Sequence, residues 1–205
     1  MLTGANVRGQ IRNRAVAYYP EKMMTINRPT CVSIAASLIC AATLTPFVGN
    51  AQAPELGRGW AEEFNLAARQ ILQLAEATPE DKFAWRPAPG VRSISEVYVH
   101  LAIGNFMLLE RSGAKLSIDK TAIPAAPEKS ITAKADVIAW LQKSFDAVRA
   151  GYGAADRQKK VQLFGRETTV DGVFLRILVH NHEHMGQAIA YARMNGVKPP
   201  WSGGN

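Results

Sequence analysis

Four stretches of the chain repeat hydrophobic residues at steps of three and four, which is the period of one face of an α-helix. Each stretch lies between residue types that commonly begin or end helices. We therefore expect four amphipathic helices, over residues 57–78, 93–113, 132–152 and 171–195.

Capping and terminating residues mark the ends of these stretches. The tetrapeptide S-I-S-E at residues 93–96 is a capping box that begins the second helix. Thr132 and Asp171 are the expected N-caps of the third and fourth helices. Pro79 ends the first helix, and Gly196 follows the last.

The connections between the helices indicate the topology. Residues 114–130 contain two prolines and form a long connection, which allows a crossover in place of simple up-and-down order. Residues 161–170 form two short extended pieces around Gly165, which predicts a small β-hairpin before the last helix. The expected fold class is all-α, a four-helix bundle with a long crossover loop and a short hairpin.

Histidines occupy inward positions on two of the predicted helices. The chain has four histidines, and His180 and His184 lie one helical turn apart, with a rise of about 6 Å. His182 points about 200° away from His180, so we do not expect it to be a ligand. The inward residues are Val173, Ile177, His180, His184, Gln187, Tyr191 and Met194 on the last helix, and Val97, His100, Leu101, Gly104, Met107 and Leu108 on the second.

Three imidazoles inside one small bundle predict a metal site. An unpaired polar group in a protein core costs about 1–3 kcal/mol, so three buried histidines need a shared partner. A divalent cation bound by His100, His180 and His184 at about 2.0–2.1 Å would provide that partner and leave a position for water. The alternative for each histidine alone is an ordinary hydrogen bond in the core.

Three further polar residues lie near these histidines in the helical pattern. Glu96, one turn before His100, could orient that ligand, although its place in the capping box already explains it. Glu183 could orient a ligand or accept a proton, and its alternative role is a solvated helix glutamate. Gln187 could line the site or make a structural hydrogen bond. None of them is a clear separate acid or base, so the catalytic residues stay unknown.

The first 53 residues read as a secretory signal peptide. Five basic residues and one acidic residue precede an apolar run at 31–48, and small residues follow at 49–53. Cleavage after Ala51 or Ala53 fits this pattern, and Pro54 directly after the second site favours Ala51. The mature domain is assigned to residues 54–205, and Met23 or Met24 could be the true start. The alternative is an uncleaved membrane anchor, since the run is near the lower length limit of a spanning helix. We expect a periplasmic or secreted protein that does not bind a membrane after cleavage.

Removal of this segment changes the cysteine content and the net charge of the mature domain. Both cysteines of the chain lie in it, so disulfides and cysteine catalysis are excluded for the mature domain. From residue 54 onward there are 19 basic and 16 acidic residues, so the net charge falls from +7 to +3. No stripe of lysine and arginine remains, and we expect no nucleic-acid binding.

Three motifs give the mature domain a recognisable resemblance. They are W-R-P-A-P-G-V-R-S at 85–93, S-E-V-Y-V-H-L at 95–101 and H-N-H-E-H-M-G-Q-A-I-A-Y-A-R-M-N-G-V-K-P-P-W-S at 180–202. Over about residues 56–202 the chain resembles the DinB-like superfamily of metal-binding four-helix bundles. The resemblance implies that His100, His180 and His184 hold zinc, nickel or another divalent ion, and it implies a frequent homodimer.

The same resemblance implies a range of functions. Some relatives are thiol S-transferases or thiol-dependent isomerases, and others are metal-dependent hydrolases. We therefore expect a metal-dependent enzyme of hydrolase or thiol S-transferase type, acting on an unidentified small-molecule substrate. The alternative is a non-catalytic metal-binding module with a structural, sensing or stress-related role. A fourth protein ligand to the ion would favour that alternative.

Overall fold

The computed structural model describes residues 57–116 and 118–203; the predicted signal peptide lies outside the described residues. No helix in the described part of the chain is long and apolar enough to cross a membrane. The elements are α1 (Trp60–Ala77), η1 (Glu80–Lys82), α2 (Ile94–Arg111), η2 (Lys120–Ala122), α3 (Pro127–Ser130), α4 (Lys134–Ala154), β1 (Lys160–Leu163), β2 (Arg166–Thr169), α5 (Val170–Met194) and η3 (Pro200–Ser202).

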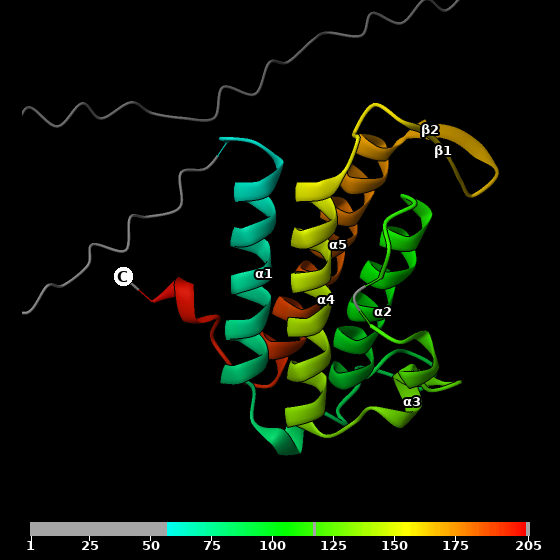
Figure 1. Cartoon of the computed structure of the whole chain (residues 1–205). Coiled ribbons are helices and arrows are strands. Elements are labelled where there is room, and N and C mark those ends of the chain that lie inside the picture. The colour runs from blue at the N-terminus through cyan, green and yellow to red at the C-terminus, as the bar shows by residue number, and fades with distance from the viewer. Residues whose placement is uncertain (1–56, 117, 204–205) are drawn as a thin grey trace, which may run out of the picture. The chain divides into compact units, whose positions relative to one another are not determined.

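The four long helices form the predicted bundle (Figure 1). Both α1 and α2 pack mainly against α4 and α5, so α1 and α2 occupy opposite corners of the bundle. Helices α1 and α2 are consecutive in sequence but are therefore not neighbours in the bundle. Residues 78–93 span this diagonal between α1 and α2, whereas the long segment that contains α3 joins the neighbouring helices α2 and α4. The expected all-α fold with a long crossover loop and a short hairpin is confirmed.

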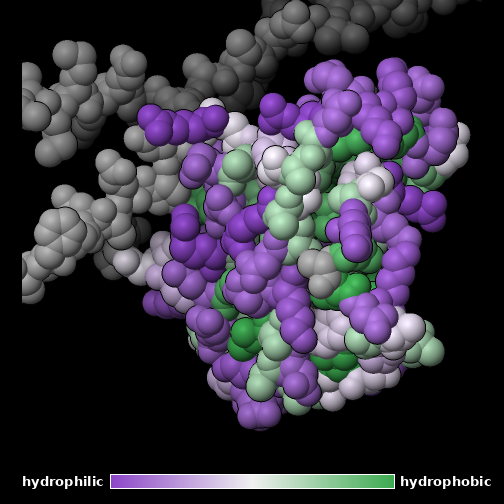
Figure 2. Space-filling view, viewed as in Figure 1, coloured by the Kyte–Doolittle hydropathy of each residue, from purple (hydrophilic) through white to green (hydrophobic). Residues whose placement is uncertain are grey.

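All four long helices contribute to the core. Its largest fully buried side chains come from all four long helices: Phe64, Ile71, Leu74, Tyr98, Leu101, Phe106, Leu108, Leu109, Leu141, Phe145, Phe174 and Ile177. Burial of each such side chain contributes about 1.5–3 kcal/mol. Figure 2 shows mainly hydrophilic side chains on the viewed face, with patches of hydrophobic ones between them.

Two methionines that the helical period places inside are exposed. Met107 has 43% and Met194 has 64% of its surface accessible, so both inward assignments are wrong. A true α-helix turns by 100° per residue, and a pattern of three- and four-residue steps drifts from its starting face over several turns. On α2 the buried Leu108 and Leu109 take the place of Met107.

Two predicted N-caps are also wrong. The Thr169 hydroxyl accepts a hydrogen bond from the Gly172 amide and caps α5, while Asp171 lies within the first turn. The hairpin explains this difference, because β2 continues directly into α5 and its register places Thr169 at the boundary. Helix α4 begins at Lys134 after Ala133, without a side-chain cap from Thr132.

The capping box at the start of α2 is present as predicted. Ser93 Oγ accepts from the Glu96 amide at 3.3 Å, and the Glu96 carboxylate accepts from the Ser93 amide at 2.9 Å. The hairpin is also as expected: β1 and β2 are antiparallel, and Phe164 and Gly165 form its two-residue turn with φ of 50° and 76°. Both values lie in the left-handed region that such turns require.

The crossover segment contains one short helix that the periodicity does not predict. Helix α3 begins at Pro127 and packs against α2. Proline disfavours a helix interior but is well suited to its first position, where its missing N–H would have no partner. This turn of helix places Glu128 beside His100 and Lys129 beside Glu96.

Candidate metal centre

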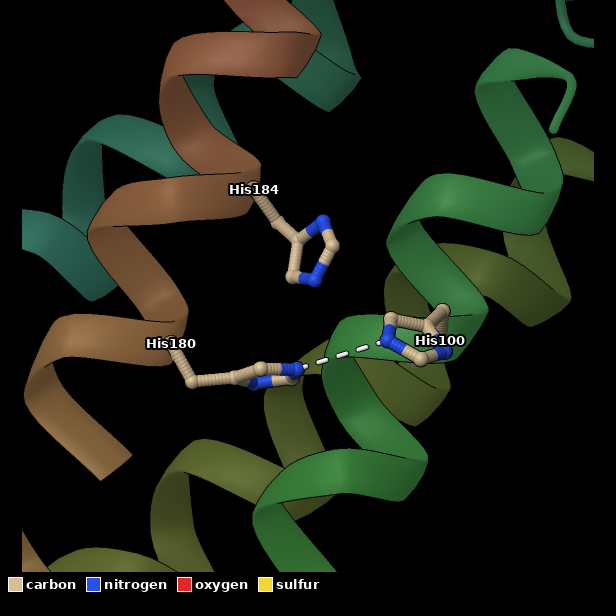
Figure 3. A group of neighbouring side chains, drawn as sticks. All are labelled: His100, His180 and His184. Carbon is tan, nitrogen blue, oxygen red and sulfur yellow. Dashed lines mark hydrogen bonds between the residues drawn. The ribbon is translucent and has the colours of Figure 1, made fainter. Parts of the chain in front are cut away.

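Three histidines from two helices converge inside the bundle (Figure 3). His180 and His184 come from α5, and His100 comes from α2. One ring nitrogen from each lies within 4.8 Å of the others. The Nε2 atoms of His100 and His180 are 3.4 Å apart. The structure therefore brings together the three residues that the sequence selects.

These distances are close to those of a metal site. Two ligands at about 2.0–2.1 Å in tetrahedral geometry are separated by roughly 3.3 Å. The His100 and His180 nitrogens already have this separation. The third nitrogen, on His184, lies within 4.8 Å of the other two, so a movement of this half-buried side chain would complete the same geometry.

Glu128, which the sequence analysis does not select, fixes the orientation of His100. Its Oε1 accepts a hydrogen bond from His100 Nδ1 at 2.8 Å, and Arg92 donates to both of its oxygens at 2.7 and 3.3 Å. Burial raises the pKa of Glu128, but the hydrogen bonds from Arg92 and His100 outweigh it and lower the pKa overall. The ionised carboxylate holds the proton of a neutral His100 on Nδ1, which leaves a lone pair on Nε2.

Gln187 plays the matching role for His184. Its Oε1 lies 3.0 Å from His184 Nδ1, and its amide nitrogen donates to the Tyr191 hydroxyl at 2.9 Å. In this orientation of the amide, Oε1 accepts from His184 Nδ1–H, and Nε2 again carries the lone pair. The pKa of His184 is lowered, first by burial, against the opposing effect of the Gln187 hydrogen bond.

His180 is the most buried of the three and packs on Gly104 of α2. A Cβ atom at position 104 would lie 2.4 Å from His180 Cε1, so only glycine leaves room for the ring. Burial, and then the neighbouring His184 and His100, lower the pKa of His180 to about 4. The ring is therefore neutral at physiological pH and has a lone pair to offer.

The polar atoms of His180 test whether the site fits a cation. Its Nδ1 has no hydrogen-bond partner among the described residues. If Nδ1 carries the proton, the Nε2 lone pairs of His180 and His100 face each other at 3.4 Å. If Nε2 carries it, the buried Nδ1 lone pair is unsatisfied and the His184 lone pair stays unshared. A cation accepts all three Nε2 lone pairs at once, so these residues fit a divalent ion.

A buried polar pair holds the two ligand-bearing helices in register. Asn105 Oδ1 on α2 accepts from Asn181 Nδ2 on α5 at 2.8 Å, and Asn105 also donates to Ser144 on α4 at 3.2 Å. Both asparagines are fully buried and directly follow Gly104 and His180 in sequence. Neither asparagine is among the inward positions that the helical period selects, so the sequence pattern does not predict this pair.

The other predicted polar neighbours lie outside the cluster. Glu183 is exposed and binds Arg176 at 2.6 Å, and this bond lowers its pKa. Glu96 binds Ser93, Arg86 and Lys129, which agrees with its capping role. His182 is exposed, and its Nδ1 lies 2.9 Å from the Leu178 carbonyl.

Fold and histidine cluster together define a four-helix-bundle protein whose centre could hold a metal ion. The model of the DinB superfamily matches residues 63–188, more than half of the chain, and the chain belongs to this superfamily. The sequence-based assignment is confirmed.

Two crystal structures share this fold. A DinB-like protein from Bacillus cereus ATCC 10987 has a TM-score of 0.59 and 17% identity, over 69% of this chain and 93% of that one. A DinB-like protein from Bacillus subtilis has a TM-score of 0.53 and 17% identity, over 67% of this chain and 91% of that one. The comparison with curated proteins found no match.

Proposed function

We propose that this protein binds one divalent metal ion through His100, His180 and His184. The observation that supports this most directly is the convergence of three imidazoles whose remaining Nε2 lone pairs have no other shared partner. Glu128 and Gln187 accept hydrogen bonds from the Nδ1 atoms of His100 and His184. In many metal sites the ligating histidine is held in this way by a residue that does not itself bind the ion.

Zinc is the first expectation for the ion. Neutral imidazoles are borderline-soft ligands that suit zinc, nickel, copper and iron, whereas magnesium and calcium prefer oxygen. A site of three histidines without a carboxylate or thiolate ligand therefore selects against the hard cations. Nickel or another divalent transition metal is the second expectation.

We further propose that the site is catalytic and acts on a small molecule. The group that could hold an ion contains three residues among those the structure describes, and structural zinc sites usually have four protein ligands. A divalent ion held by three imidazoles supplies Lewis-acid chemistry to a water molecule or to a thiol. Glu128 and Gln187 orient the rings of His100 and His184, and His180 packs on Gly104.

Hydrolysis and thiol S-transfer are the two reaction types that this site best supports. A panel of esters, amides and thiol-acceptor pairs tests them with the zinc-loaded protein. Turnover that depends on His184 supports an enzyme. Full metal content and stability without turnover across the panel would favour the non-catalytic metal-binding module.

Export is a separate proposal that depends on the N-terminal sequence alone. We propose that a signal peptide within residues 1–53 is removed and that the mature domain works in the periplasm or outside the cell. Mass spectrometry of the protein from cell fractions tests this proposal, with a mature N-terminus after Ala51 or Ala53 as the expected result. An intact N-terminus in the membrane fraction would favour the uncleaved anchor.

Elemental analysis tests the metal proposal directly. We expect about one ion per chain in the wild-type protein and a loss of the ion in His100→Ala and His184→Ala. His182→Ala is the matched control, because this residue lies in the same short run but is exposed and faces away. Equal metal content in all four proteins would overturn the three-histidine site.

A further inference from the structure

A polar cavity of about 570 Å³ lies beside the candidate metal centre. Its walls come from the loop before α2, the first turn of α2, the short helix α3 and one residue of α5. This volume is within the range of sites for small molecules. The charged and polar residues that line it include Arg86, Arg92, Glu96, Glu128, Lys129 and Gln187.

The cavity is adjacent to the histidines through two shared residues. Glu128 lines it and contacts His100, and Gln187 lines it and contacts His184. A molecule in this cavity is therefore separated from His100 and from His184 by single side chains.

The charges of the lining are unequal. Arg92 pairs with Glu128, with Nε 2.7 Å from Oε2. Glu96 is shared by two cations, Arg86 at 3.1 Å and Lys129 at 2.5 Å. Three cations thus face two carboxylates, and one positive charge is uncompensated. The Lys129 side chain is 68% exposed and free to reorient toward a ligand.

We infer that this cavity binds an anionic group, a carboxylate or a phosphate, of the small molecule whose other end reaches the three histidines. The inference rests on the proposed metal-dependent function. A divalent ion among neutral imidazoles adds two further positive charges next to the cavity, and a positively charged concave site attracts and orients anions. The guanidinium groups and the ammonium supply the donors that carboxylate and phosphate accept.

The competing explanation is that these cations only hold the two glutamates. Arg92 is sufficient for Glu128, and Arg86 makes two bonds to Glu96 and one to the Val91 carbonyl. Lys129 also binds Glu96, but it is the more exposed of the two cations there, and the capping box and Arg86 would still bind the carboxylate if Lys129 turned toward a ligand. Lys129 is therefore the residue that separates the two explanations.

Calorimetric titration of the zinc-loaded protein with succinate and with methyl phosphate tests the inference, with uncharged succinamide as the reference compound. We expect at least one anion to bind and succinamide not to bind. Lys129→Gln should weaken the anion about fivefold, and Lys129→Arg should restore it. Lys143→Gln is the control, because Lys143 is exposed on α4 beside Trp140 and away from the cavity lining.

The outcomes separate this inference from the proposed function. Anion binding that is equal in Lys129→Gln and Lys143→Gln, or that needs zinc but not Lys129, would overturn the anionic subsite while the metal site stands. Failure of both anions to bind would also overturn it. Lys129-dependent binding by a wild-type protein that holds no metal would support the subsite and reject the metal proposal.

Discussion

At the scale of single residues, the cluster depends on a side chain outside the four long helices. Glu128 receives the Nδ1 hydrogen bond of His100 and is held by Arg92. We expect Glu128→Ala to lower zinc affinity about 10- to 100-fold, because the outer partners of ligating histidines fix the ring and raise its basicity. Competition with a chromophoric chelator measures this change.

Glu183→Ala is the matched control for Glu128→Ala. Glu183 is directly before His184 in sequence, but its carboxylate is exposed and binds Arg176. We expect the zinc affinity of Glu183→Ala to stay within about twofold of the wild-type value, because exposed ion pairs contribute little free energy. Equal losses in both variants would show that Glu128 acts only as a nearby negative charge and does not orient His100.

Gly104 provides a second test at the same scale. Gly104→Ala should displace the His180 ring, weaken zinc binding and lower the free energy of unfolding by about 1–3 kcal/mol, because the new Cβ would lie 2.4 Å from His180 Cε1. Gly186→Ala is the control: it lies on α5 with no atom within 4 Å of the new Cβ, and alanine there should add up to about 1 kcal/mol of stability. Zinc affinity and chemical denaturation of both variants measure these effects. Normal zinc binding in Gly104→Ala would contradict the proposal that glycine at this position makes room for the His180 ring.

At the scale of elements, Glu96 joins three segments. It caps α2 and binds Arg86 of the preceding loop and Lys129 of α3. Burial raises the pKa of Glu96, but the hydrogen bonds from Lys129, the Ser93 amide and Arg86 outweigh it and bring the pKa down to about 2. The ionised carboxylate therefore stabilises the folded state.

This pKa predicts how stability changes in acid. The contribution of Glu96, at most about 3 kcal/mol, is complete above pH 4.5 and is lost as the pH falls from 4.5 toward 2. Glu96→Gln should lower the free energy of unfolding at pH 7 and flatten its dependence on pH in this range. Urea denaturation at several pH values measures both effects. Glu80→Gln, on the exposed turn η1, controls for loss of a charge, and the same flattening there would contradict the role of Glu96.

The same scale shows where sequence patterns succeed and where they do not. The long helices are predictable, because each buries one face over several turns and its hydrophobic period is visible in the sequence. The short helix α3 has four residues, too few to show a period, and its Pro127 resembles a loop signal. Glu128 contacts His100 across 28 positions, and only the packing of α3 on α2 creates that contact.

At the scale of the whole molecule, the histidine cluster follows from the bundle itself. An imidazole in a hydrophobic stripe points into the core, so His100, His180 and His184 are selected by the same periodicity that predicts the helices. The sequence cannot show that α1 and α2 occupy opposite corners, since no pattern in residues 78–93, which join them, indicates the path of this connection across the bundle. The cavity beside the site is likewise beyond sequence patterns, because its walls come from four separate segments.

The proposed ion would join α2 to α5 and should therefore stabilise the whole fold. With free zinc at about 1,000 times its dissociation constant, binding adds about 4 kcal/mol to the free energy of unfolding, which corresponds to a rise of about 10 °C in Tm. We expect this rise in the wild-type protein and in His182→Ala, its removal by a chelator, and no rise in His184→Ala. Calorimetric scans with and without zinc measure it. An equal rise in His184→Ala would place the stabilising ion elsewhere, since the other two histidines belong to different helices and a pair of ligands holds zinc far more weakly than three.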